Sequence, residues 1–183
     1  MIFFTSDNHF GKYTSADEAI ERWNRKVSEN DTVYIAGDIF SHDMKEAEKY
    51  LDILNGKKIL ILGNNDPFWL MHLNEDSKKK YFSDIKQGMV LNIGHYKIEL
   101  CHFPKKTNAD ILICGHIHAS QRGKGYSILK NSPCSFNAGV MITVGEPVSF
   151  SELVGFNEKF YERGHSEKEE VLFREIDKEL QKL

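Results

Sequence analysis

The 183-residue sequence lacks three features that would define other classes of protein. No hydrophobic run approaches the ~18 residues that a membrane-spanning helix requires. The three cysteines form no CxxC pair, and an odd number cannot all pair within the chain, so we expect neither a disulfide framework nor a cysteine zinc site. The apolar residues 2–4 have no basic flank and do not match a signal peptide. These absences predict a soluble, cytoplasmic protein without a membrane partner.

The sequence also lacks an excess of positive charge. Lys and Arg number 24 against 27 Asp and Glu, which gives a formal net charge of −3. Domains that bind duplex nucleic acid are usually strongly basic, so we do not expect duplex nucleic acid as a partner, and a DNA nuclease is disfavoured. The length and a hydrophobic content of 40% instead predict one globular domain spanning residues 1–183.

In the first third of the chain, short apolar runs alternate with amphipathic segments, a pattern typical of βα units. Ser15 and Glu18 have the spacing of a helix-capping pair, and Gly56 has the position of a glycine that ends a helix. We predict strands at 2–5, 32–36 and 58–62, helices at 15–30, 44–55 and 67–73, and an exposed connection at 74–80.

The pattern changes after residue 89, where apolar runs follow one another closely and predict a second, more antiparallel sheet. Ser149 and Glu152 form a second candidate capping pair, at the start of a helix over residues 149–160. Residues 166–183 place their leucines and isoleucine on one stripe and predict a C-terminal amphipathic helix that covers the domain. The apolar runs lie at 89–93, 96–101, 111–114, 126–129 and 134–144.

Polar residues of particular types follow the predicted strands directly. Ligands of open α/β sheets bind beyond the carboxyl ends of the strands, so these residues can converge on one crevice. Each piece alone is ordinary turn chemistry, but turns have no need of histidine, and the joint pattern favours a functional site. The five clusters are Asp7-Asn8-His9, Gly37-Asp38, Gly63-Asn64-Asn65-Asp66, His102 and Gly115-His116-Ile117-His118.

These residue types are those that a two-metal centre needs. The Asp7/His9 and His116/His118 pairs each place two candidate ligands two residues apart, and a carboxylate such as Asp38 can bridge two cations. Neutral imidazoles with oxygen ligands suit first-row metals such as Mn, Fe, Zn or Ni.

The five clusters, in this order, resemble the signature blocks of the calcineurin-like metallophosphoesterases, and the C-terminal part resembles small single-domain bacterial and phage members. The resemblance implies a four-layer α/β/β/α sandwich with two divalent metal ions, manganese being our first choice and Fe, Zn or Ni the alternatives. It implies one metal set of Asp7, His9, Asp38 and His118, and a second of Asp38, Asn64, His102 and His116.

One position departs from the family pattern. Where the family usually has a histidine that is held by the next acidic residue and protonates the leaving oxygen, this chain has Asn65 followed by Asp66. An amide cannot deliver a proton, and small members that lack this histidine tend to favour phosphodiesters. We therefore predict a phosphodiesterase in which a metal-bridging hydroxide attacks in line, with Asn65 and Asp66 at the catalytic position.

Two other readings stay open: a phosphomonoesterase or protein phosphatase with a replacement acid such as His42 or His72, and a catalytically weak metal-binding scaffold. Arg122 is the candidate for substrate binding, because a guanidinium pairs well with phosphate. The expected partner is a phosphate-ester substrate, with a nucleotide among the options. We expect the protein to be a monomer or a small homo-oligomer.

Overall fold

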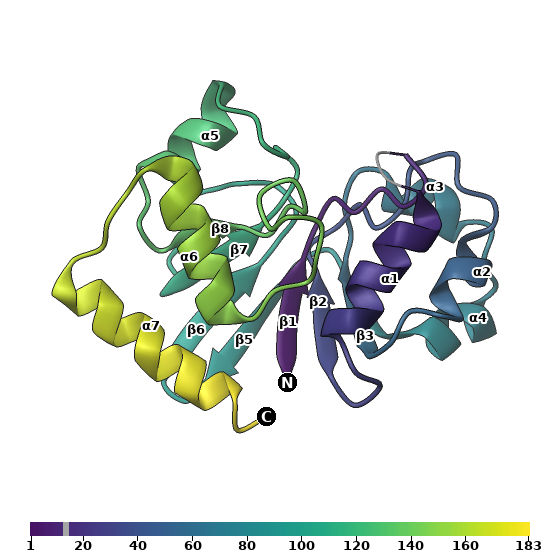
Figure 1. Cartoon of the computed structure of the whole chain (residues 1–183), viewed down its shortest axis with the longest axis horizontal. Helices are drawn as coiled ribbons and strands as arrows, with labels where there is room; N and C mark the ends of the chain where they lie inside the picture. Colours follow the sequence, from purple (N-terminus) through teal and green to yellow (C-terminus); the bar gives the residue numbers. More distant parts are fainter. Residues whose placement is uncertain (13–14) are drawn as a thin grey trace.

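Two four-stranded β-sheets lie side by side in the computed structural model, which describes residues 1–12 and 15–183 (Figure 1). The first sheet has the order β1-β2-β3-β4, and all of its strand pairs are parallel. The second has the order β5-β6-β7-β8. The strands are β1 (Ile2–Thr5), β2 (Thr32–Ile35), β3 (Lys57–Ile61), β4 (Phe82–Lys86), β5 (Met89–Ile93), β6 (Tyr96–Leu100), β7 (Ile111–Cys114) and β8 (Ser135–Asn137).

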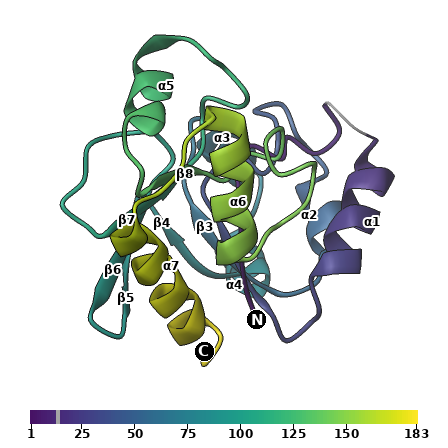
Figure 2. The same ribbon diagram turned by 60° about the vertical axis from the view of Figure 1, so that its left-hand side comes forward.

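Helices flank the two sheets on their outer sides, which confirms the expected layered α/β architecture (Figures 1 and 2). Within the described residues, α1 to α4 accompany the first sheet and α5 to α7 the second, and the buried apolar residues form three clusters. Phe4 and Ile61 of the first sheet share a cluster with Ile98 and Ile113 of the second, so the sheets pack on each other. The helices are α1 (Ala16–Lys26), α2 (Ala47–Leu51), α3 (Asp66–Leu70), α4 (Glu75–Tyr81), α5 (Gly123–Lys130), α6 (Phe150–Tyr161) and α7 (Glu167–Leu180).

The second sheet differs from the expectation of a mainly antiparallel sheet. Only β5 and β6 pair antiparallel, whereas β6–β7 and β7–β8 are parallel. The apolar run at 126–129 is not a strand but part of α5, which joins the parallel strands β7 and β8 as a crossover connection. Of the run at 134–144, only β8 is a strand.

The first sheet has one strand more than predicted. The polar segment expected as a connection at 74–80 forms α4, because Asn74 accepts a hydrogen bond from the Ser77 amide at 2.8 Å and starts the helix. Tyr81 is the buried residue of α4, so the segment has no apolar stripe, and β4 follows directly. The helix predicted at 44–55 is shorter in the structure, where α2 has Asp52 as its C-cap. The prediction that Gly56 ends this helix is therefore wrong, because Gly56 lies in a later turn with φ of 85°.

Both predicted capping contacts are present at the start of α6, but only one of the two is present at the start of α1. Ser149 and Glu152 form a reciprocal capping box at the start of α6. At α1, the Ser15 hydroxyl accepts from the Glu18 amide at 3.2 Å, but the Glu18 carboxylate pairs with Arg22 at 2.5 Å. The predicted C-terminal helix is present as α7, which packs Phe173, Ile176 and Leu180 into the core of the second sheet.

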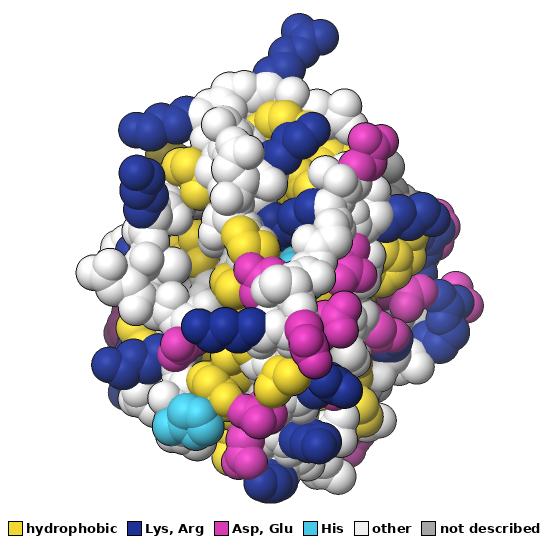
Figure 3. Space-filling view, turned by 90° about the vertical axis from the view of Figure 1, so that its left-hand side faces the viewer, with side chains coloured by type: hydrophobic (Ala, Val, Ile, Leu, Met, Phe, Trp, Pro, Cys, Tyr) yellow, Lys and Arg dark blue, Asp and Glu magenta, His cyan; other side chains and the backbone are white. Residues whose placement is uncertain are grey.

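The surface on the α5–α7 side carries Lys and Arg side chains interspersed with Asp and Glu (Figure 3). All three cysteines are free thiols. Among the described residues, no helix combines the length and the apolar character needed to cross a bilayer.

Asn157 of α6 holds the end of β8 through its buried side chain. Its Oδ1 accepts from the Asn137 amide at 2.8 Å, and its Nδ2 donates to the Asn137 carbonyl at 3.0 Å. Asn137 Nδ2 in turn donates to the His118 carbonyl at 2.8 Å. The amide of Asn157 therefore links α6, through β8, to the loop that carries His118.

We expect Asn157→Ala to lower the free energy of unfolding by about 3 kcal/mol, because it leaves buried backbone groups of Asn137 without partners. Urea unfolding followed by circular dichroism measures the change. Asn131→Ala is the matched control, since the exposed Asn131 amide contacts only Ser127 of its own helix, and it should cost less than about 0.5 kcal/mol. Equal losses in the two variants would contradict this role of Asn157.

Candidate metal centre

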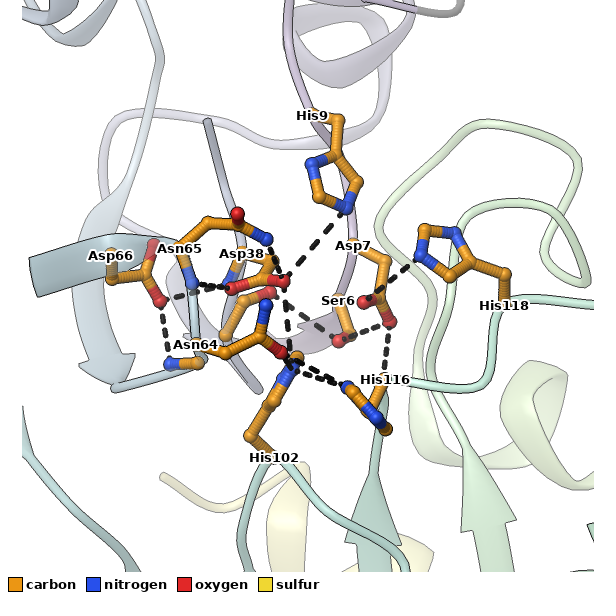
Figure 4. A network of polar contacts seen from close by, with 12 residues as sticks. Ser6, Asp7, His9, Asp38, Asn64, Asn65, Asp66, His102, His116 and His118 are labelled. Atoms are coloured by element: carbon orange, nitrogen blue, oxygen red, sulfur yellow. Dashed lines mark hydrogen bonds and ion pairs between the residues drawn. The ribbon is translucent and has the colours of Figure 1, made fainter. Parts of the chain in front are cut away.

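The five polar clusters come together beyond the carboxyl ends of five strands, β1, β2 and β3 of the first sheet and β6 and β7 of the second (Figure 4). Parallel strands end at the same edge of a sheet, so the sheet packing brings loops that lie far apart in the sequence into one place. Both sheets therefore contribute to a single site.

The candidate ligands form two overlapping groups. The ligand atoms of Asp7, His9 and His118 all lie within 4.8 Å of one another, and so do those of Asp7, Asp38 and His102. Asp38 lies between His9 and His102. Its Oδ2 is 3.9 Å from His9 Nε2 and 3.6 Å from His102 Nε2. Groups of this composition are consistent with the metal site expected from the sequence.

Asn64 and His116 extend the second group. Asn64 Oδ1 lies 3.1 Å from His102 Nε2 and 3.0 Å from His116 Nδ1, and these two ring nitrogens are 3.3 Å apart. Figure 4 shows the side chains of these three residues meeting below the two carboxylates.

The hydrogen bonds of His102 determine which nitrogen is available for a ligand. Its Nδ1 lies 2.8 Å from the Ala36 carbonyl oxygen, which can only accept, so a neutral ring carries its proton on Nδ1. Nε2 then has a lone pair that faces the oxygens of Asn64 and Asp38. Acceptors that face one another without a proton between them fit a bound cation.

Asp7 provides a second test of this fit. Its Oδ2 accepts from Ser6 Oγ at 2.7 Å and from the His116 amide at 2.9 Å. Its Oδ1 is buried and has no hydrogen-bond partner among the residues that the structure describes. A buried carboxylate oxygen without a partner is costly, and a metal ion would satisfy it.

Burial also shifts the pKa values of several candidate ligands. Desolvation lowers the pKa of His9 to about 4, and desolvation together with the nearby His102 lowers the pKa of His116. Desolvation raises the pKa of Asp7. At neutral pH the imidazoles of His9 and His116 are uncharged, which is the form that binds a metal.

The backbone at the ligands is unusual. Five candidate ligands have left-handed conformations, with φ between 41° and 71°. Non-glycine residues rarely adopt such angles, and clusters of them are typical of functional sites. The five are Asp7, His9, Asp38, His116 and His118.

Two glycines of the predicted clusters let the loops approach closely. A Cβ at Gly115 would overlap Ser6 Oγ, and a Cβ at Gly63 would overlap Asp38 Oδ1. Each glycine therefore leaves room for a side chain that belongs to a candidate ligand or holds one.

Asn65 and Asp66 both contact Asp38. The Asn65 side-chain amide donates to Asp38 Oδ2 at 2.5 Å, and its backbone amide donates to Asp38 Oδ1 at 2.8 Å. Asp66 is fully buried, and its Oδ2 accepts from the Asp38 and Gly63 amides at 2.8 and 2.7 Å. Burial raises the pKa of Asp66 to about 6. These contacts make Asp66 a positioning residue that holds the β2 and β3 loops together.

The other candidates lie at or beyond the edge of the site. Arg122 is exposed at the N-cap of α5, and none of its contacts within the described residues reaches a candidate ligand. His42 is exposed, with its ring 6.2 Å from that of Phe68, and His72 is exposed after α3. The roles predicted for Arg122, His42 and His72 stay predictions.

Three supporting residues were not predicted from the sequence. Ser6 holds Asp7, Trp69 Nε1 donates to Asp66 Oδ1 at 3.0 Å, and Asn137 holds the His118 loop. Ser6 directly precedes a predicted ligand, which is a usable signal. Trp69 stands three residues after Asp66 in the same helix, a spacing that places the two side chains on one face. Asn137 has no such signal, because its partner His118 lies in a different loop, 19 residues away.

Residues 1–147 match the family model described as the calcineurin-like phosphoesterase superfamily domain. The chain belongs to this superfamily. An uncharacterised protein of Methanocaldococcus jannaschii is 28% identical over 178 residues, covering 86% of this chain and 92% of the relative.

A solved structure agrees with this assignment in fold. A protein of unknown function from Aquifex aeolicus superposes with a TM-score of 0.61 and 25% identity, over 81% of this chain and 94% of that one. An archaeal phosphodiesterase is more distant, with a TM-score of 0.48 and 22% identity over 75% of this chain and 82% of that one.

We expect Mn²⁺ to raise the melting temperature of the metal-free protein by roughly 5–10 °C at a concentration 100 times its dissociation constant. The reason is that the ion binds the folded site and not the unfolded chain. His102→Ala should reduce this shift by at least half, as measured by scanning calorimetry.

His95→Ala is the matched control, because His95 is exposed and packs its ring against Tyr96, outside the candidate ligands. It should keep the full Mn²⁺-dependent shift. Absence of any shift with Mn, Fe, Zn and Ni alike would rule out the metal centre.

Proposed function

We propose that this protein is a phosphodiesterase that hydrolyses its substrate at a two-metal centre. The observation that carries the proposal is the position of Asp38, whose Oδ2 lies within 4 Å of a histidine from each ligand group. A carboxylate placed between two histidines in this way suits a bridge between two cations, and Asp7, which belongs to both ligand groups, would bind beside it.

Bound divalent ions would supply Lewis acidity, polarising a phosphate oxygen and lowering the pKa of a water molecule. Asp7, His9, Asp38 and His118 would hold one ion, and Asp38, Asn64, His102 and His116 the other. Manganese is our first choice of metal and Fe, Zn or Ni are the alternatives, since imidazole nitrogens together with hard oxygens suit all four.

The chain itself positions these ligands and the substrate. Ser6 and the His116 amide bind Asp7 Oδ2 and leave Oδ1 available for a cation, and the Ala36 carbonyl binds His102 Nδ1 and leaves Nε2 available. Asp66 keeps the Asp38 loop against the Gly63 loop. A phosphate bound between the two ligand groups would then meet fixed groups that need little reorganisation.

The preference for a diester rests on Asn65. Its amide donates to Asp38 Oδ2 and can offer a hydrogen bond to a phosphate oxygen, but it cannot protonate a leaving alkoxide. General acid catalysis contributes about 10²–10⁴-fold, so its loss disfavours monoesters whose leaving group needs a proton. Together with the family resemblance of this motif, the amide supports diester hydrolysis.

The proposal predicts Mn²⁺-dependent hydrolysis of bis(p-nitrophenyl) phosphate, and a loss of at least about 100-fold in Asp38→Asn. Asparagine keeps the shape of the side chain and tolerates the φ of 57° at this position, so the variant removes charge rather than the fold. Absorbance of p-nitrophenolate measures the rate, and elemental analysis measures the bound metal.

Asp76→Asn is the matched control, because Asp76 is exposed in the first turn of α4, and it should keep wild-type activity. Full metal content and full activity in Asp38→Asn would refute the two-metal proposal. No turnover of any mono- or diester by metal-loaded wild type would favour a scaffold instead.

We expect Asn65→His to shift the ratio of p-nitrophenyl phosphate to bis(p-nitrophenyl) phosphate hydrolysis towards the monoester by at least about tenfold. The imidazole would restore a proton donor at the leaving oxygen. Steady-state kcat/KM for the two esters gives the ratio, and Asn131→His controls for an added surface histidine. An unchanged ratio at unchanged metal content would contradict our account of Asn65.

A further inference from the structure

A pocket of about 440 Å³ opens beside the candidate metal centre, between the loops that follow β1 and β2. One wall consists of Phe10, Gly11 and Lys12, directly after the ligand His9, and the other of residues 41–46, three positions after Asp38. The Phe10 amide donates to the Ile39 carbonyl at 3.1 Å, and Phe10 and Phe40 form a parallel bridge. The pocket is thereby held in a constant position relative to the ligands.

The walls of the pocket combine apolar surface with hydrogen-bonding groups. Phe10 is buried and Met44 is half-buried, whereas the Asp43 carboxylate is exposed. The Ser41 hydroxyl oxygen is buried and has no hydrogen-bond partner in the part of the chain that the structure describes. Such an oxygen can pair with a polar group of a ligand.

The charges of the pocket balance. Lys12 and Lys45 are matched by Asp43 and Glu46 along the same walls. A pocket that binds a phosphate in addition to the one at the metal ligands would carry an excess of positive charge. The balance of charges therefore favours an uncharged group that has hydrogen-bond donors and acceptors.

An exposed aromatic ring lies next to the pocket. The His42 ring, which lines the pocket, meets the Phe68 ring edge-on, with centroids 6.2 Å apart and an interplanar angle of 81°. Phe68 is 54% exposed in α3, directly after the Asn64–Asp66 cluster. An exposed phenylalanine beside a polar pocket offers a stacking surface for a flat ring.

We propose that this pocket binds the nucleobase of a nucleoside-bearing phosphodiester, with the scissile phosphate at the candidate metal ligands. The inference rests on the proposed phosphodiesterase function and adds the substrate class. A nucleobase has a flat apolar face for Phe68 and a neutral polar edge for Ser41 and Asp43. The volume is within the range of small-ligand sites, whereas an acyl chain would find four charged side chains along the walls.

The test compares two esters with the same leaving group and scissile bond, thymidine 5′-(p-nitrophenyl phosphate) and methyl p-nitrophenyl phosphate. We define the nucleoside preference as the ratio of their kcat/KM values in the Mn²⁺-loaded protein. The ratio should exceed ten in the wild type. Phe68→Ala should lower it by at least about fivefold through loss of one stacking contact.

Two further variants separate stacking from general damage. Phe68→Leu keeps an apolar side chain but removes the ring, and it should lower the nucleoside preference nearly as much as Phe68→Ala. Val171→Ala changes an exposed apolar residue on α7, remote from the pocket, and should leave the ratio at the wild-type value. A wild-type ratio near one, or an unchanged ratio in both Phe68 variants, would overturn the nucleobase pocket while leaving the phosphodiesterase in place.

A binding measurement distinguishes failure of the pocket from failure of the catalytic proposal. If neither ester is hydrolysed, the phosphodiesterase proposal fails, and adenosine and thymidine, which carry no phosphate, still probe the pocket. Titration followed by amide NMR should then shift the resonances of residues 10–12 and 41–46 in the wild type and much less in Phe68→Ala. Absence of these shifts in the wild type would overturn the pocket.

Discussion

One electrostatic constraint shapes the structure. Carboxylate oxygens, an amide oxygen and imidazole nitrogens are crowded together beyond the carboxyl ends of the strands of both sheets. His102 Nε2, Asn64 Oδ1 and Asp38 Oδ2 approach one another with the His102 proton committed to the Ala36 carbonyl. Facing acceptors repel in a buried environment, where the effective dielectric constant is low. Cations at this point would turn that repulsion into attraction, so the arrangement is consistent with a metal site.

Much of the surrounding structure holds these acceptors in place. Asp66 connects the β2 and β3 loops through two backbone amides, and Trp69 fixes Asp66 in turn. On the other sheet, Asn157 holds β8, and Asn137 holds the loop of His118. Left-handed backbone at five ligands costs free energy, about 1–3 kcal/mol for each residue, and these supports supply the compensating interactions.

The departure at Asn65 and the pocket beside His9 bear on the same question, which substrate this centre takes. Asn65 places a neutral donor on Asp38, and its amide cannot protonate a leaving group. The pocket between residues 10–12 and 41–46 has balanced charge and an aromatic neighbour, so it complements a neutral ring better than a second anion. Under the two proposals, reaction type and substrate shape would be set by different loops of the same edge.

The sequence alone determined the strand-end positions of the seven candidate ligands and the parallel order of the first three strands, because βα units and histidines after strands are local patterns. It did not show α4 and β4, whose helix has no apolar stripe, or the parallel pairing of β7 with β8, which depends on α5 as a crossover. Only the tertiary structure decided the left-handed ligand backbone, the contact of Asp66 with the Asp38 amide and the contacts of Asn157 with Asn137. These arise where loops distant in sequence are pressed together, and no local pattern encodes such contacts.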